Sequence, residues 1–266
     1  MTKPLSYILT APEKKILEEI KKVEKRMHLN LSGEKRGSGG RKRVDAETAF
    51  VGVVLVLRYG LPWSLLDHLT GHSAAIYRRF RLWSVHFLPQ LFERSQLRKA
   101  WRGPVSVDST YLKCGHDSLK HKAREEQSVG RSKGGWTSKL HIVTGAGGHI
   151  LNYRLSPGNH ADISHLLPLL KHHRPSHLMA DKAYSSKDLV SSLKQRRITA
   201  VIPSRSNERL QRPLDKPRYR TRHLVENAFC RLKRSRRLAL RSDSLLSVFT
   251  GFVLLSVISF NFSLSV

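Results

Sequence analysis

The sequence predicts an α/β protein, in which a mixed sheet flanked by helices follows an all-helical N-terminal part. Apolar residues recur at helical spacing between about residues 45 and 100, whereas after Trp101 short apolar runs bounded by turn residues alternate with helical stretches. The 266 residues, 39% of them hydrophobic, allow one large or two modest domains. We expect three parts: an N-terminal helix with a basic linker over 1–44, a helical domain over 45–100 and the α/β domain over 101–266.

The N-terminal part begins with a predicted amphipathic helix. Thr10 and Glu13 have the spacing of a capping box, with Pro12 at the start of the helix, and apolar residues follow at helical intervals. The helix is expected to end before the segment from Gly33 to Arg43, which is rich in Gly, Ser, Lys and Arg. Such a segment is either a flexible basic arm that follows DNA or a solvated loop without a function.

The helical domain is predicted to contain three helices in close succession, over about 49–58, 63–69 and 73–83. Gly60 and Gly71 separate them. This spacing is typical of a helix-turn-helix, whose second helix enters the DNA major groove, but also of helical pairs with a purely structural role. In the DNA-binding interpretation the last of these helices presents three arginines to DNA: Arg78, Arg79 and Arg81.

The α/β domain is predicted to have the element order β, β, β, α, β, α, β, α. The expected strands cover 104–108, 139–144, 149–155, 176–180 and 198–203, and the expected helices cover 162–172, 186–197 and 219–233. Asp108 and Asp181 each end an apolar run, and neighbouring strands would bring both to one crevice. An aspartate that only caps the turn after a strand would have the same position.

Charge indicates the class of partner. The chain has 48 Lys and Arg against 20 Asp and Glu, a formal net charge of +28, which is typical of proteins that neutralise a phosphate backbone. A ribosome-associated RNA binder or a protein bound to an anionic membrane would have a similar charge. Glu226 is isolated among Lys and Arg on a predicted helix, where Arg222 and Lys233 share its face. With Asp108 and Asp181 it would supply oxygen ligands from separate elements, as a divalent metal requires.

Three short motifs resemble the DDE-type transposases of bacterial insertion sequences, specifically the group called insertion sequence five. At its third acid this family has Tyr, two residues, Arg, three residues, Glu, six residues and Lys, a spacing that the chain matches from Tyr219 to Lys233. The residues after Asp181 and around Asp108 are similar to the family's patterns at the other two acids. The likeness continues at 57–63, 130–139 and 157–162 and covers about residues 45 to 263.

The resemblance implies a ribonuclease H-like catalytic core that cleaves DNA and transfers the cut strand. It implies that two divalent ions, Mg²⁺ or Mn²⁺, are bound by a catalytic triad: Asp108, Asp181 and Glu226. It also implies that DNA is contacted by three residues of the last motif: Tyr219, Arg222 and Lys233. The expected partners are double-stranded DNA, from the element ends and the target, and at least one further copy of the chain, because two ends must be paired.

Two other interpretations compete with this one. Residues 244–266 contain no Lys, Arg, Asp or Glu over 23 residues, which is long enough to span a bilayer. The serines of this segment and the family's closing helix, packed against the sheet, instead favour a cytoplasmic protein without membrane contact, associated with the nucleoid when bound to DNA. The second competitor is a non-catalytic DNA-binding protein derived from a transposase.

Asp162 lies close to the triad in the family's pattern and is a further candidate metal ligand. The chain has no Gly-rich loop with a P-loop lysine, so we expect no nucleotide cofactor.

Overall fold

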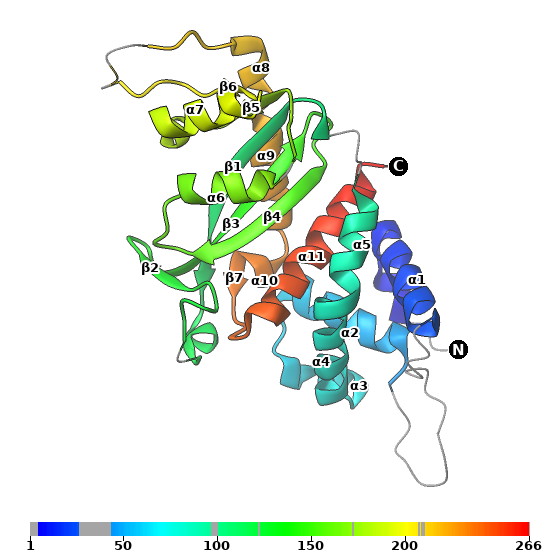
Figure 1. Ribbon diagram of the computed structural model, residues 1–266. Helices are drawn as coiled ribbons and strands as arrows, with labels where there is room; N and C mark the ends of the chain where they lie inside the picture. The colour runs from blue at the N-terminus through cyan, green and yellow to red at the C-terminus, as the bar shows by residue number, and fades with distance from the viewer. Residues whose placement is uncertain are drawn as a thin grey trace. The chain divides into compact units, whose positions relative to one another are not determined.

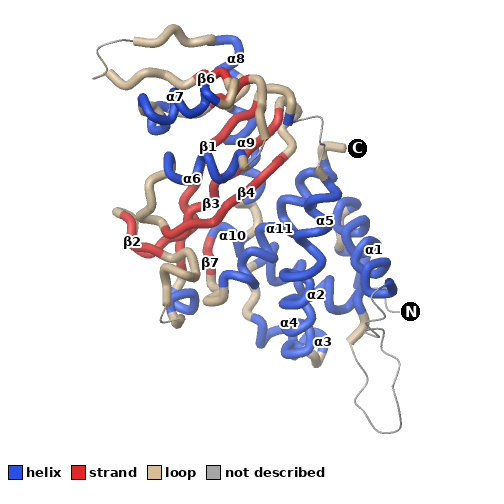
Figure 2. The backbone as a smooth tube through the Cα atoms, viewed as in Figure 1, coloured by secondary structure: helices blue, strands red, loops and turns tan. Residues whose placement is uncertain are grey.

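The computed structural model describes residues 5–26, 44–96, 101–121, 123–171, 173–206, 208 and 211–265. The chain divides into two compact units, shown as ribbons in Figure 1 and by secondary structure in Figure 2. The helical unit comprises Met1–Ser95 and Leu232–Val266, and the sheet unit comprises Gln96–Arg231. The predicted basic segment from Gly33 to Arg43 lies outside the described residues.

The helical unit is built from elements at both ends of the chain. Its helices are α1 (Ala11–Arg26), α2 (Ala46–Tyr59), α3 (Leu66–Thr70), α4 (Ser73–Leu82), α5 (Leu88–Ser95), α10 (Arg236–Ala239) and α11 (Leu246–Ser263). Short 3-10 turns cover Leu5–Ile8 and Trp63–Leu65, a π-helical turn covers Trp83–Phe87, and the two-residue strand β7 covers Leu240–Arg241.

The predicted helix boundaries in this unit are largely confirmed. The Glu13 carboxylate accepts hydrogen bonds of 2.8 Å from both the amide and the hydroxyl of Thr10, as the capping box predicts. Gly60 and Gly71 end α2 and α3 in the left-handed conformation, each with φ of 69°. The structure departs from the prediction after α4, because the π-helical turn carries the helical path onward into α5.

The expectation that Arg79 contacts DNA is wrong, because the side chain is buried. Its side chain is 6% exposed and pairs with the buried carboxylate of Glu24, at 2.9 Å from Nε and 2.5 Å from Nη2. The indole of Trp83 donates a 2.8 Å bond to the same carboxylate, and the backbone carbonyl of Val44 accepts from Arg79 Nη1. Arg79 therefore ties α4 to α1 inside the helical unit. The neighbouring arginines of α4, Arg78 and Arg81, are exposed.

The C-terminal helix α11 forms much of the core of the helical unit. It is long and apolar enough to cross a membrane, but 67% of it is buried within the structure. The ring centroid of Phe252 lies 4.5 Å from that of Phe80 and 5.9 Å from that of Trp63. By compactness the residues from Leu232 onward group with the helical unit, whereas the expected α/β domain ran from 101 to 266.

The sheet unit has the predicted element order with one additional strand. Its strands are β1 (Val105–Cys114), β2 (Gly130–Ser132), β3 (Gly135–Gly145), β4 (Ile150–Pro157), β5 (His177–Met179) and β6 (Thr199–Val201). Its helices are α6 (Ile163–Leu170), α7 (Lys187–Gln195), α8 (Lys216–Arg220) and α9 (His223–Leu232), and a short 3-10 turn covers Lys182–Tyr184. The helix predicted over 219–233 is thus interrupted, and Arg222 lies between its two parts.

The central strand β1 pairs antiparallel with β3 and parallel with β5, and β5 pairs parallel with β6. On its other edge β3 pairs antiparallel with β4 and β2. The main strands therefore lie in the order β4, β3, β1, β5, β6, with only β3 running against the others. This arrangement is the ribonuclease H-like sheet that the resemblance implies, and the predicted fold class is confirmed.

Alternation along β1 separates the two faces of the sheet. Val105 and Val107 belong to a buried cluster with Leu166 of α6 and Leu189 of α7, so these helices cover their face (Figure 2). The side chain of Asp108 projects from the opposite face of β1. It lies within this ten-residue strand and not at its end, in contrast to the prediction, because β1 continues through the polar residues that follow.

The buried pair of Arg79 and Glu24 yields a first prediction. We expect Arg79→Met to lower the free energy of unfolding by about 3 to 5 kcal/mol, because it leaves a buried carboxylate without its cation. Urea unfolding followed by circular dichroism measures this change. The matched control is Arg78→Met, on the exposed face of the same helix, which should change stability by less than about 0.5 kcal/mol. Equal losses in the two variants would contradict a structural role for Arg79.

Candidate active site

The three predicted acids come from three elements of the sheet unit. Asp108 lies in β1, Asp181 precedes the Lys182–Tyr184 turn that follows β5, and Glu226 lies in the first turn of α9. The parallel register pairs Val105 with Leu178 and Ser106 with Met179, and the same offset places Asp108 level with Asp181. Asp181 itself lies two residues beyond the end of β5, so it is the continuation of this register that sets it beside Asp108.

The charges of the other two acids act on the pKa of Asp108. Burial raises this pKa above its ordinary value, and the charges of Asp181 and Glu226 raise it further. The Ser109 amide, which donates a 2.7 Å hydrogen bond to the Asp108 carboxylate, and the charge of Arg222 act in the opposite direction without cancelling the rise. Asp108 is thus a carboxylate that would bind a cation strongly, since its ionised form is poorly solvated.

Arg222 joins two of the acids. Its Nη1 lies 2.9 Å from Asp108 Oδ2, while its Nη2 pairs with Glu226 Oε1. Burial alone lowers the pKa of Arg222, but the carboxylates of Glu226 and Asp108 raise it above its ordinary value, so the guanidinium stays charged. The guanidinium also lies 5.8 Å from the ring centroid of Tyr219. Three residues of the predicted motif therefore meet, whereas Lys233 follows the end of α9 and falls in the helical unit.

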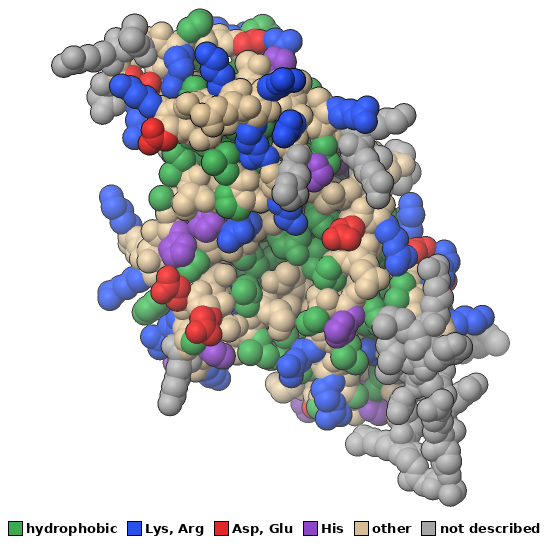
Figure 3. Space-filling model, viewed as in Figure 1, with side chains coloured by type: hydrophobic (Ala, Val, Ile, Leu, Met, Phe, Trp, Pro, Cys, Tyr) green, Lys and Arg blue, Asp and Glu red, His purple; other side chains and the backbone are tan. Residues whose placement is uncertain are grey.

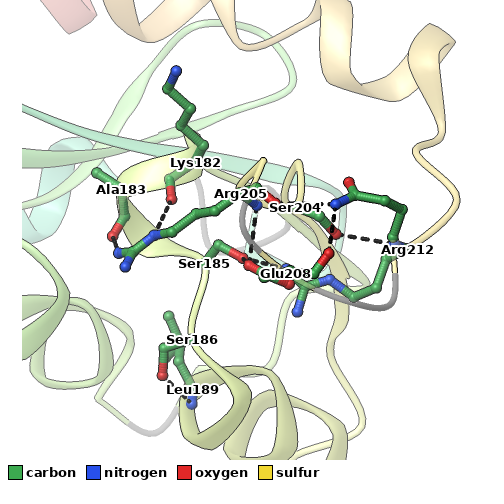
Figure 4. A network of polar contacts seen from close by, with 10 residues as sticks. Lys182, Ala183, Ser185, Ser186, Leu189, Ser204, Arg205, Glu208 and Arg212 are labelled. Atoms are coloured by element: carbon green, nitrogen blue, oxygen red, sulfur yellow. Dashed lines mark hydrogen bonds and ion pairs between the residues drawn. The ribbon is translucent and has the colours of Figure 1, made fainter.

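The turn that carries Asp181 is held by a loop that the sequence did not single out (Figure 4). Asp181 caps its own turn, accepting a 2.9 Å bond from the Ala183 amide. Arg205, in the loop after β6, donates to the carbonyls of Lys182 at 3.2 Å and Ala183 at 2.9 Å. Arg205 is in turn fixed through its amide, which donates to Glu208 at 3.0 Å. Arg205 therefore positions the backbone on which Asp181 depends.

The donor set fits a divalent cation in its chemistry, since hard oxygen atoms from carboxylates are what Mg²⁺ and Mn²⁺ prefer. Within the described residues, however, no three His, Cys, Asp or Glu side chains are close enough together to hold a metal ion. Instead, the guanidinium of Arg222 lies as a cation between Asp108 and Glu226.

Asp162 is engaged elsewhere in the sheet unit. Its carboxylate pairs with Lys139 at 2.9 Å, and the same ammonium donates a 2.7 Å bond to the carbonyl of His160. Burial and the neighbouring His165 lower the pKa of His141 to about 3, so His141 stays neutral beside this pair. The family's pattern alone did not indicate that Lys139 neutralises Asp162.

Positive charge extends well beyond these residues. Figure 3 shows Lys and Arg side chains over much of the visible face, with fewer acidic side chains among them. This distribution agrees with the net charge of +28 and gives a surface suited to a polyanion.

Comparison with known proteins shows similarity to transposases. Residues 102–262 match the protein family described as the transposase DDE domain. A protein of Brucella ovis that carries the name of a transposase for insertion sequence element IS6501 is 37% identical over 122 residues, covering 44% of this chain and 92% of that protein.

Two solved structures resemble the chain more distantly. A piggyBac transposase synaptic complex with hairpin DNA aligns with 77% of this chain and 51% of its own, at 15% identity and a TM-score of 0.38. A Mos1 transposase paired-end complex with the left transposon end aligns with 86% of this chain and 75% of its own, at 11% identity and a TM-score of 0.26. Likeness at this level supports no conclusion about function.

The raised pKa of Asp108 yields a prediction about stability. A carboxyl whose folded pKa exceeds its ordinary 3.8 stabilises the fold below that pH and loses this contribution as pH rises through the folded pKa. We therefore expect Asp108→Asn, in the presence of EDTA, to unfold at a higher temperature than wild type at pH 7. The difference should shrink as the pH falls towards 4.

The control for this experiment is Asp215→Asn in the same unit. Hydrogen bonds from Arg218 lower the pKa of Asp215, so the ionised form is the stabilising one above pH 3.8 and this variant should unfold at a lower temperature at pH 7. If Asp108→Asn were also destabilising at pH 7, burial would not be the dominant influence on Asp108.

Proposed function

The chain belongs to the transposase DDE domain family, and from this premise we propose that Asp108, Asp181 and Glu226 form the catalytic triad of an enzyme that cleaves the ends of an insertion sequence and joins them to target DNA. One observation carries the assignment of residues. Adjacent parallel strands bring Asp108 level with Asp181, and Arg222 links Asp108 to Glu226. The spacing of the last motif supports membership of the group called insertion sequence five.

The family implies dependence on divalent metal, and we propose two ions, Mg²⁺ or Mn²⁺, held by the three carboxylates. Bound ions of this kind activate the attacking water or 3′-hydroxyl and stabilise the leaving oxygen. Asp108 supplies a partly buried carboxylate, and Asp181 is held by its capped turn. Glu226 pairs with Arg222 through one oxygen, so Arg222 would compete with a metal for this carboxylate.

Arg222 would then turn to the DNA. A guanidinium fork matches a phosphate as well as it matches a carboxylate, so the same side chain can exchange one for the other. Tyr219 and Lys233 complete the proposed DNA contacts of this motif, and the exposed Arg78 and Arg81 of α4 are proposed contacts of the helical unit.

The proposed partners are double-stranded DNA and further copies of the same chain. The charge of +28 supports a polyanionic partner. Pairing of two element ends requires at least a dimer in the active complex. We propose a cytoplasmic location, at the nucleoid when the protein is bound to DNA, since the long apolar helix α11 is largely buried.

One observation favours a second candidate, a DNA-binding protein without catalysis. Arg222 occupies the position between Asp108 and Glu226 where a cation ligand set would form. A permanent guanidinium there would keep out metal and leave a protein that binds DNA but does not cut it. The cleavage experiment below separates the two candidates.

We expect the wild-type chain to nick a plasmid that carries its gene and flanking DNA, in Mg²⁺ or Mn²⁺ and not in EDTA. Asp108→Asn, Asp181→Asn and Glu226→Gln should each lower the nicking rate by roughly 1,000-fold or more, because each removes a ligand of the reacting centre. Gel electrophoresis of the plasmid measures the rate, and a gel shift shows whether DNA binding persists.

The control for the triad is Asp188→Asn, which removes an exposed carboxylate of α7 and should nick like wild type. Triad variants that nick at the wild-type rate would overturn the assignment. A wild type that binds the DNA without nicking it would favour the non-catalytic candidate.

Competition between Arg222 and metal can be measured without DNA. We expect Arg222→Gln to lower the dissociation constant for Mn²⁺ by about tenfold, the change that ~1.4 kcal/mol of relieved competition produces. Isothermal titration calorimetry measures it. Arg220→Gln, which removes the same charge from an exposed position two residues earlier, should change the constant much less. Equal or weaker binding by Arg222→Gln would show that Arg222 does not compete.

A further inference from the structure

The sheet unit contains a groove that the proposed catalytic residues do not use. Its volume is about 690 Å³, and it is formed where the end of β1, the β2–β3 turn and the loop between β4 and α6 meet. Four of its lining residues are basic: Lys113, Arg131, Lys133 and Lys139. No acidic residue is among the described residues that line it. The groove therefore suits an anionic ligand.

The walls of the groove are closely packed and preformed. A Cβ at Gly130 would lie 1.9 Å from Asn159 Oδ1, and a Cβ at Gly158 would lie 1.9 Å from Thr137 Oγ1. Only glycine allows the two segments to approach so closely. The same segments, 130–139 and 157–162, carry part of the family resemblance, but the proposed triad uses neither of them.

Lys139 organises the floor of the groove. It is 4% exposed, and its charge is balanced by Asp162 at 2.9 Å, so it fixes the floor and is not available to a ligand. Its ammonium lies 4.8 Å from the ring centroid of Tyr111, which holds this ring in place. Tyr111 nevertheless remains 50% exposed. The groove thus presents a fixed, half-exposed aromatic ring beside basic side chains.

The basic side chains of the walls are placed differently from Lys139. Lys113, Arg131 and Lys133 are all exposed, on β1, β2 and the following turn. Cations that flank an exposed aromatic ring are the combination that binds single-stranded nucleic acid, with phosphates on the cations and a base on the ring.

Size decides between single-stranded and duplex DNA. A groove of about 690 Å³ has the volume of a small-ligand site, which suits one or two nucleotides and not a double helix. A base can lie on Tyr111 only when it has left its own stack.

The position of the groove separates it from the reacting phosphate. Tyr111 follows Asp108 by three residues, which is about 10 Å along the strand, and it leaves β1 on the other face. A nucleotide bound here is therefore not the one that is cleaved.

We propose that this groove binds one or two unpaired nucleotides of the DNA on which the enzyme acts, with a base stacked on Tyr111 and phosphates paired with Arg131 and Lys133. The inference rests on the proposed function for the source of the DNA. The binding itself requires only the groove, so it can be tested without catalysis.

The test uses the full chain in EDTA and a twelve-nucleotide single strand that contains 2-aminopurine, with the same sequence as a duplex for comparison. Wild type should bind the single strand and quench its fluorescence. We expect Tyr111→Ala to weaken single-strand binding about tenfold and to abolish most of the quenching, whereas Tyr111→Phe keeps both. The double variant Arg131→Gln with Lys133→Gln should bind with a shallower dependence of log affinity on log salt concentration. The change in slope should correspond to the loss of about one or two phosphate contacts.

The matched control removes two charges from α7 of the same unit, as Lys187→Gln with Lys194→Gln, both exposed. This variant should keep the quenching and the wild-type salt dependence. Circular dichroism confirms that every variant is folded. The inference is overturned if Tyr111→Ala binds and quenches like wild type, or if the groove variants lose duplex and single-strand binding equally.

Failure of this inference is distinguishable from failure of the proposed function. Wild-type nicking together with groove variants that behave like the α7 control would refute the groove and leave the enzyme intact. Loss of quenching in Tyr111→Ala, in a chain that never nicks DNA, would support the groove and refute the catalytic proposal.

Discussion

The pairing of β1 with an antiparallel neighbour on one side and a parallel neighbour on the other is the constraint on which the rest of the sheet unit depends. Parallel pairing with β5 brings Asp108 level with Asp181, while alternation along β1 sends Val107 into the core and Asp108 away from it. A shift of one residue in this register would exchange the two faces. The hydrophobic core under α6 and α7 therefore also fixes the face of the sheet from which Asp108 projects.

Partial burial of the Asp108 carboxylate has an electrostatic cost, and the chain offsets it locally. Burial and mutual repulsion disfavour the ionised form of Asp108, and the guanidinium of Arg222 relieves part of that strain by pairing with Asp108 and Glu226. Asp162 is neutralised in the same way, by the buried ammonium of Lys139. In each place a cation from the chain accompanies an acid that water cannot reach freely.

The order of elements along the sheet unit could be predicted because its signals are local: apolar runs and turn residues. The extent of β1 beyond Asp108 could not, since polar residues there hide the strand. The burial of Arg79 could not be predicted either, because its partner Glu24 lies 55 residues away and all three arginines of α4 look alike in the sequence. Arg205 and the partner of Asp162 depend in the same way on contacts between distant segments.

The composition of the helical unit from both ends of the chain has a consequence for synthesis. Phe252 of α11 completes an aromatic cluster with Phe80 and Trp63, so the N-terminal helices lack part of their core until the last segment has left the ribosome. A product that stops after the sheet unit would contain Asp108, Asp181 and Glu226 but no finished helical unit. Such a product would leave the rings of Phe80 and Trp63 without the packing of Phe252.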